Sequence, residues 1–196
     1  MKFLGLGRLS VFGKALVFMG ALTAALVVVW FVSDELALYP DTKEIESCIS
    51  AASQKHNVSP ALIRAIIWRE SKFNPRVVGK AKEIGLMQIT DGAVKDWSAA
   101  TKQRVSSRRS LFKPSLNIEI GTWYLARAAK HWNGYKSKEI LQISEYNAGY
   151  GNVSKGWKPK SPDREVKLSD ITISSTRKYV EDVLKKKAEY EKSEKK

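Results

Sequence analysis

The sequence is poor in the residues that build disulfide frameworks and metal centres. Cys48 is the only cysteine among 196 residues, so no intrachain disulfide can form. The two histidines, His56 and His131, are far apart in the sequence, which leaves no Cys/His cluster with the spacing of zinc ligands. We therefore expect no metal and no cofactor, and a fold that depends on a packed apolar core.

Acidic residues are also few compared with basic ones. The chain has 34 Lys and Arg against 20 Asp and Glu, which gives a net charge of +14. Its 43% hydrophobic and 28% charged residues are otherwise ordinary for a globular protein. A chain this basic attracts polyanions, which include nucleic acid, anionic lipid and acidic cell-wall polymers.

One long apolar run lies near the N-terminus. Residues Ala15 to Val32 are interrupted only by Thr23, and 18 residues of helix span roughly 27 Å, close to the ~30 Å of a bilayer core. No small residues that would form a cleavage site follow the run directly. We expect an uncleaved signal anchor that crosses the inner membrane through residues 15–32. A cleaved signal peptide is the alternative.

Charges beside this run predict its orientation. Lys2, Arg8 and Lys14 precede it, and Asp34 and Glu35 follow it, so the N-terminus should face the cytoplasm. We expect a single-pass protein of the cytoplasmic membrane whose remaining chain lies outside the cytoplasm, on the periplasmic side where there is an outer membrane. That part keeps 31 Lys and Arg against 20 Asp and Glu, a net charge of +11. Outside the cytoplasm this charge favours an acidic wall polymer over nucleic acid, which we do not expect as a partner.

The remaining chain shows helical periodicity and few strand signals. Asp41 and Glu44 have the spacing of a capping box, and Ser59-Pro60 predicts the start of a second helix that ends near Ser71. Further helices are expected over 91–100, 115–131, 138–146 and 175–190, with loops over 76–84 and 149–163. We expect a mostly α single domain with minimal β structure over 43–185, preceded by a stub and transmembrane helix over 1–33 and a linker over 34–42. Residues 186–196 should form a charged tail.

Glu70 is the first candidate for chemistry. It shares a helix face with Ile66 and Ile67, which predicts a carboxylate among apolar groups. Such surroundings disfavour the charged form and raise the pKa, which suits a general acid that works near neutral pH. The alternative is a glutamate that pairs with Arg69 or Lys72 at the helix end.

Five short sequence blocks stand in order along the chain. They are Glu70-Ser71-Lys72-Phe73-Asn74-Pro75, Gly85-Leu86-Met87-Gln88-Ile89, Asn117-Ile118 with Gly121 and Tyr124-Leu125, Tyr146 to Val153, and Thr176-Arg177 with Tyr179-Val180. Together, over about Ile45 to Leu184, they resemble the SLT-type lytic transglycosylases, and the ordered set is more specific than any one block alone.

This resemblance implies a lysozyme-like fold related to goose-type lysozymes. It also implies cleavage of the β-1,4 bond between N-acetylmuramic acid and N-acetylglucosamine in peptidoglycan glycan strands, with formation of a 1,6-anhydromuramoyl end. Glu70 would protonate the leaving oxygen and then accept the proton of the attacking C6 hydroxyl, with the substrate N-acetyl group in place of a second carboxylate.

The resemblance also implies roles for other residues. Ser71 and Gln88 match polar contacts near the scissile bond, and Met87 matches an apolar wall of the groove. Tyr146 matches a residue that donates a hydrogen bond to the catalytic carboxyl, and Asn147 would support the loop that contains Tyr146. For Met87 and Tyr124, packing in the core is the alternative. We expect Trp68 and Trp123 to lie in the core.

Two positions depart from the family pattern. Lys82-Glu83-Ile84 stands where small residues usually precede Gly-Leu-Met-Gln, and Glu145 stands where alanine usually precedes Tyr-Asn-Ala-Gly. We expect Glu83 and Glu145 to be solvated or ion-paired. If either were a second catalytic carboxylate, the chain would be a hydrolytic lysozyme. A third possibility is a non-catalytic peptidoglycan-binding module of an envelope assembly.

Overall fold

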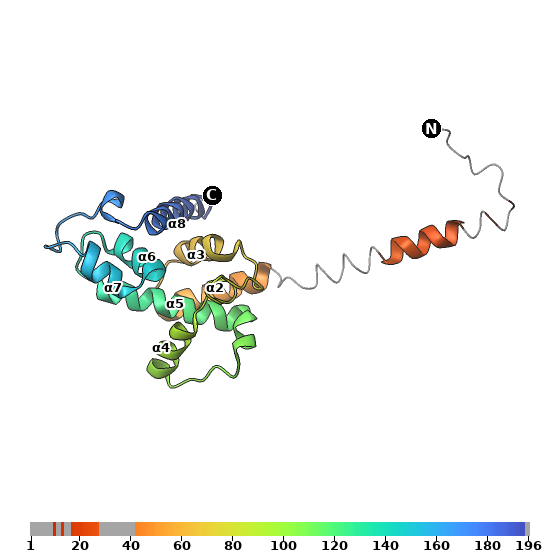
Figure 1. The fold of residues 1–196 in the computed structure, drawn as a ribbon, viewed down its shortest axis with the longest axis horizontal. Coiled ribbons are helices and arrows are strands. Elements are labelled where there is room, and N and C mark those ends of the chain that lie inside the picture. Colours follow the sequence, from red (N-terminus) through yellow and green to blue (C-terminus); the bar gives the residue numbers. More distant parts are fainter. Residues whose placement is uncertain (1–9, 11–12, 14–16, 28–41, 195–196) are drawn as a thin grey trace. The chain divides into compact units, whose positions relative to one another are not determined.

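The chain divides into two compact units, Met1–Pro40 and Asp41–Lys196. A computed structural model describes residues 10, 13, 17–27 and 42–194. In the first unit residues 17–27 are helical (Figure 1). No helix within the described ranges has both the length and the apolar character needed to cross a membrane. Parts of the predicted span over 15–32, nearly all of the linker over 34–42 and Asp41 of the predicted capping box lie outside the described residues.

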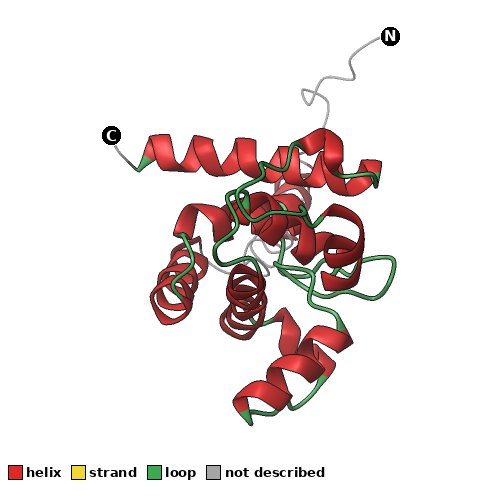
Figure 2. Ribbon diagram, turned by 90° about the vertical axis from the view of Figure 1, so that its left-hand side faces the viewer, coloured by secondary structure: helices red, strands yellow, loops and turns green. Residues whose placement is uncertain are grey.

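The second unit is built almost entirely of helices, as the periodicity predicts (Figure 2). Between residues 42 and 194, pairing of extended segments is limited to two isolated bridges, Val78 with Ile84 and Ile84 with Ile89. The longer helices are α2 Thr42–His56, α3 Pro60–Ser71, α4 Asp91–Thr101, α5 Pro114–His131, α6 Lys138–Ala148 and α8 Ser174–Ser193. The short ones are η2 Arg108–Phe112, α7 Tyr150–Asn152, η3 Val153–Trp157 and η4 Leu168–Asp170.

Both ends of α3 have clear local causes. Ser59 caps its start by accepting a hydrogen bond from the Leu62 amide at 3.4 Å, and Pro60 occupies the first turn, where its missing N–H costs nothing. Its end is at Lys72, which takes a left-handed conformation (φ 53°). These signals confirm the helix predicted between Ser59 and Ser71, and they place Glu70 in its last turn.

The core of this unit lies where α5 meets α2 and α6, and where α3 and α6 meet α8. Figure 1 shows α5 running beside α2 and α6, with α8 next to α3. Fully buried side chains from α3, α5 and α8 meet in this core, among them Ile63, Ile66, Leu125 and Val180. Every residue of the core comes from 45–190, so this unit has a complete apolar core of its own.

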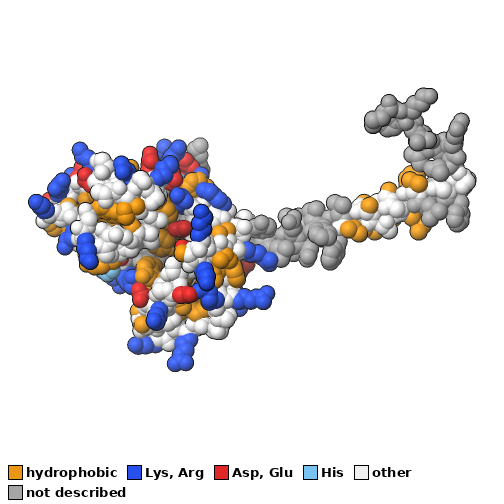
Figure 3. All heavy atoms as spheres, in the orientation of Figure 1, with side chains coloured by type: hydrophobic (Ala, Val, Ile, Leu, Met, Phe, Trp, Pro, Cys, Tyr) orange, Lys and Arg blue, Asp and Glu red, His pale blue; other side chains and the backbone are white. Residues whose placement is uncertain are grey.

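Lys and Arg side chains spread over the visible face of the second unit, with fewer acidic side chains between them (Figure 3). Trp68 is partly exposed. It is half-buried rather than in the core, and the Lys72 Nζ lies 3.1 Å from its ring centroid. Trp123 is also only partly buried but packs against the core, as predicted.

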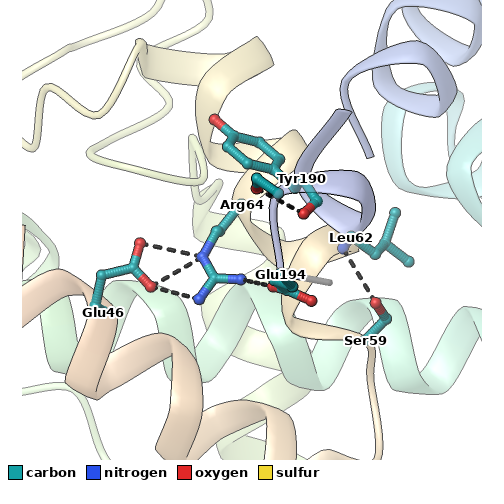
Figure 4. Close-up of polar contacts among 7 residues, drawn as sticks. Glu46, Ser59, Leu62, Arg64, Tyr190 and Glu194 are labelled. Carbon is teal, nitrogen blue, oxygen red and sulfur yellow. Dashed lines mark hydrogen bonds and ion pairs between the residues drawn. The ribbon is translucent and has the colours of Figure 1, made fainter. Parts of the chain in front are cut away.

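The helix α8 continues to Ser193, beyond the helix predicted over 175–190 and into the segment 186–196 that is predicted as a charged tail. Arg64 of α3 explains this difference. Its guanidinium contacts both carboxylate oxygens of Glu46 in α2, at 2.6 to 3.1 Å, and it pairs with Glu194 just beyond α8 (Figure 4). Tyr190 adds apolar contact by packing against the core. Tertiary contacts thus hold a segment whose own sequence has little to bury.

The segment predicted as a loop over 149–163 contains helical turns. Residues 150–157 form α7 and η3, and the side chains of Val153 and Trp157 are buried. Its glycines and lysines suggest a loop, but these two apolar residues have the spacing of one helical turn and anchor the segment to the core.

Candidate active site

Glu70 lies in the last turn of α3, where it is half-buried. Its Oε1 accepts a hydrogen bond of 2.6 Å from the hydroxyl of Tyr179, a buried residue of α8. The contact between α3 and α8 therefore fixes the position of this carboxyl group. The sequence predicts Tyr146 as the donor, and this is wrong: the Tyr146 hydroxyl donates to the Met87 carbonyl at 2.9 Å.

The surroundings of Glu70 raise its pKa from 4.5 to about 7. Burial is the main cause, because it disfavours the charged form, and the charge of Glu83 acts in the same direction. The hydrogen bond from Tyr179 and the positive charge of Arg69 oppose this shift. Near neutral pH the carboxyl is present in both protonation states, so it can both give and accept a proton.

A loop over residues 84–89 approaches Glu70 from the next part of the chain, and Asn117 of α5 holds it. The buried Asn117 side chain accepts from the Met87 amide at 2.8 Å and donates to the carbonyls of Ile84 and Leu111 at 2.8 and 2.7 Å. Gly85 has φ 81°, and a Cβ there would lie 2.3 Å from the Asn117 Nδ2. Both the conformation and the space therefore require glycine at this position.

Two of the predicted substrate contacts hold this loop instead. The buried Ser71 donates its hydroxyl hydrogen to the Leu86 carbonyl at 2.8 Å. Met87 is fully buried, and a Cβ at Gly121 of α5 would lie 2.5 Å from its sulfur. Ser71 and Met87 thus position the loop between α3 and α5, and the core alternative for Met87 is the one that the structure supports.

The other predicted residues lie at or near a pocket of about 190 Å³. Gln88 and Tyr146 line it, and the Gln88 amide group donates to the Gly85 carbonyl at 2.8 Å. Asn147 follows at an exposed position of α6. Tyr124 also lines the pocket, and its hydroxyl donates to Asp96 at 2.9 Å. The complete lining is Gln88, Ile89, Thr90, Ala93, Tyr124, Glu145, Tyr146 and Gly149.

The two carboxylates that depart from the family pattern have different surroundings. Glu83 is partly exposed and accepts from the Ala81 amide at 3.0 Å. Glu145, expected to be solvated or ion-paired, is buried and not solvated; it pairs with His131 and accepts from Trp132, each at 2.8 Å. Among the described residues, no three His, Cys, Asp or Glu side chains are arranged to hold a metal ion.

Sequence reasoning did not assign roles to Tyr179 and Asn117. Both belong to the ordered blocks, but Tyr179 lies 109 residues from Glu70, and Asn117 lies about 30 residues from the loop that it holds. Helical periodicity reports which residues face the core, but not which distant polar group they meet there.

Comparison with known proteins agrees with this geometry. Membrane-bound lytic murein transglycosylase C of Salmonella arizonae is 39% identical over 111 residues, which are 54% of this chain and 31% of that protein. The same protein of Salmonella typhi has the same identity and coverage. The chain therefore matches about a third of the length of these relatives.

Two solved structures share the fold. An inactive mutant of the lytic transglycosylase Slt of Pseudomonas aeruginosa has a TM-score of 0.68 and 25% identity, over 79% of this chain and 25% of that one. The 70 kDa soluble lytic transglycosylase of Escherichia coli has a TM-score of 0.62 and 28% identity, over 74% of this chain and 23% of that one. The transglycosylase SLT domain family matches residues 47–168, more than half of the sequence. The chain thus belongs to the SLT transglycosylase family, with a lysozyme-like fold.

Proposed function

We propose that this chain is a peptidoglycan lytic transglycosylase. It cleaves the bond between N-acetylmuramic acid and N-acetylglucosamine and leaves a 1,6-anhydromuramoyl end. The observation that carries the proposal is the Glu70 carboxyl, half-buried, bound by Tyr179 and with a pKa of about 7. The relatives named as lytic transglycosylases support it, since one is 39% identical over 111 residues and another shares the fold.

Glu70 serves in both steps of this reaction. Its protonated form gives the proton to the glycosidic oxygen as the bond to the anomeric carbon breaks. The resulting carboxylate then takes the proton of the muramoyl C6 hydroxyl, whose oxygen forms the new bond to the anomeric carbon. The enzyme returns to its initial protonation state and no water is consumed. Because Tyr179 binds Oε1, Oε2 is the oxygen that exchanges the proton.

The pocket beside the 84–89 loop holds the sugar in this proposal. Gln88 and Tyr146 provide polar and aromatic atoms at its wall, and the exposed Asn147 lies next to it in sequence. Ser71 and Met87 act indirectly, because they fix the backbone from which Gln88 projects.

The test digests purified sacculi and measures the mass of the released muropeptides. The wild-type chain should give products one water lighter than those of a hydrolase. Glu70→Gln should lose at least ~10²-fold in activity, since glutamine cannot exchange the proton. Glu83→Gln is the matched control, because the charge of Glu83 acts on Glu70 but its carboxyl exchanges no proton in either step, and it should keep most activity.

Two results would contradict the proposal. Hydrated products would identify a hydrolytic lysozyme of the same fold. Binding to sacculi without any cleavage by the wild-type chain would identify a peptidoglycan-binding module instead.

We also propose that residues 15–32 anchor the chain in the inner membrane, with the SLT domain outside the cytoplasm. The apolar run and its flanking charges support this. In the described helix over 17–27, large apolar side chains are exposed, from 49% for Val17 to 74% for Phe18. Full-length protein should remain in washed membranes, whereas a chain without residues 1–32 should be soluble and active. Recovery of the full-length chain in the soluble fraction would refute the anchor.

A further inference from the structure

The Glu145 carboxylate fixes two rings beside the pocket. One oxygen accepts from the indole nitrogen of Trp132 and the other contacts Nδ1 of His131, both at 2.8 Å. Trp132 is buried, whereas the His131 side chain keeps 35% of its surface exposed. Both oxygens of Glu145 are therefore engaged, although the residue belongs to the pocket lining.

Tyr150 packs on these same two rings. Its ring centroid lies 4.8 Å from that of His131 and 5.9 Å from that of Trp132, with which it stacks at an interplanar angle of 29°. The two rings pack against one side of Tyr150, yet 52% of the residue is exposed. An exposed ring that is held in place loses little conformational freedom when a ligand covers it.

Gly149 brings this ring to the edge of the pocket. It has φ 80° and ψ 154°, a conformation that is essentially restricted to glycine, and it ends α6. It lines the pocket itself and directly precedes Tyr150. The end of α6 at Gly149 thus places the exposed ring of Tyr150 next to the pocket that Gln88 and Tyr146 line.

We propose that Tyr150 is a stacking platform for a pyranose ring of the glycan strand, and that Glu145 is a positioning residue that acts through His131 and Trp132. This inference rests on the proposed function. The apolar C–H face of a pyranose suits an exposed aromatic ring, as in other sites where aromatic groups and a few polar groups line a concave surface. Glu145 is thereby assigned to substrate binding and not to a second proton transfer.

The test compares kinetics on soluble glycan strands from which the peptides have been removed. Tyr150→Ala should raise KM about 5- to 10-fold, the scale of one aromatic contact, and leave kcat within about twofold. Tyr150→Phe should keep the wild-type KM, because the ring remains. Tyr135→Ala is the control: its ring also contacts Trp132, at 5.7 Å, but unlike Tyr150 it does not directly follow a residue that lines the pocket, so its KM should not change.

Glu145→Ala should raise KM as Tyr150→Ala does, and the double variant should show no further increase, because one residue acts through the other. If Glu145→Ala does not fold, Glu145→Gln, which keeps one acceptor, should show a smaller increase in the same direction. Full additivity of the two changes would overturn the role of Glu145.

Binding of N-acetylglucosamine tetramers to the Glu70→Gln chain, measured by calorimetry, separates this inference from the proposed function. Tyr150→Ala in that background should weaken binding by the same factor, whether or not the wild-type chain makes anhydro ends. Unchanged Kd and KM in Tyr150→Ala would overturn the platform and leave the proposed function intact. Absence of anhydro product from the wild type would refute the function alone.

Discussion

Replacement of Glu70 by glutamine should make the protein more stable at neutral pH but not at acid pH. The raised pKa of Glu70 means that the folded state resists its ionisation, whereas the unfolded chain ionises near pH 4.5. Below pH 4.5 Glu70 is protonated in both the folded and the unfolded state, so its raised pKa does not change the free energy of unfolding. Between pH 4.5 and 7 Glu70 ionises in the unfolded chain but not in the folded protein, so the free energy of unfolding falls as the pH rises. Above pH 7 Glu70 is ionised in both states, and the loss of stability stays constant.

The size of this effect follows from the pKa. A change from 4.5 to about 7, at about 1.4 kcal/mol for each pH unit, corresponds to about 3 kcal/mol. Glutamine has no ionisation to suppress, and its carbonyl can still accept the hydrogen bond from Tyr179. Glu70→Gln should therefore match the wild type near pH 4 and exceed its free energy of unfolding by about 3 kcal/mol at pH 7.5.

Urea unfolding of residues 33–196, followed by circular dichroism at pH 4, 5.5 and 7.5, measures this difference. Glu165→Gln is the control, because the Glu165 side chain is 64% exposed and its removal should change stability little at any of these pH values. A difference between Glu70→Gln and the wild type that does not depend on pH would refute the reasoning. So would a glutamine variant that is less stable than the wild type at pH 7.5.

Three further changes test other contacts. Tyr179→Phe removes the bond that lowers the pKa of Glu70, so the alkaline limb of the pH–activity profile should move to higher pH; an unmoved limb would contradict the assigned donor. Asn117→Ala leaves the Met87 amide and the Leu111 carbonyl without a partner, whereas the Ile84 carbonyl keeps the Ile89 amide, so urea unfolding should show a loss of about 3 kcal/mol, and native-like stability would refute its role. Added salt should weaken pelleting of residues 33–196 with sacculi, since their net charge of +11 is screened; binding independent of salt would exclude an electrostatic attraction.

The sequence predicts most of the helices because their start and core signals are local. Ser59 and Pro60 define the beginning of α3 within a few residues, and the apolar spacing around Ile66 places Glu70 against the core. Burial, the main cause of the raised pKa of Glu70, follows from that placement. These features depend on neighbours in sequence, which is why pattern reasoning finds them.

The errors concern contacts between distant segments. Tyr179, not Tyr146, binds Glu70, and the length of α8 depends on Arg64, which lies about 130 residues before Glu194. The sequence predicts that Ser71 contacts the substrate, but its hydroxyl donates to the carbonyl of Leu86, 15 residues later. Each of these outcomes depends on which polar group a fold brings opposite another, and helical periodicity does not contain that information.

The bond between Tyr179 and Glu70 has a consequence for the order in which the site is made. The ribosome adds Tyr179 109 residues after Glu70, so a nascent chain carries the acid long before it carries the donor. Contacts of such sequence separation form late in folding, because the intervening chain must first be ordered. The Glu70 carboxyl therefore reaches its final surroundings only when α8 has been synthesised and has docked on α3. The site is therefore complete only once the chain extends through α8, and products that end before Tyr179 keep Glu70 without its partner.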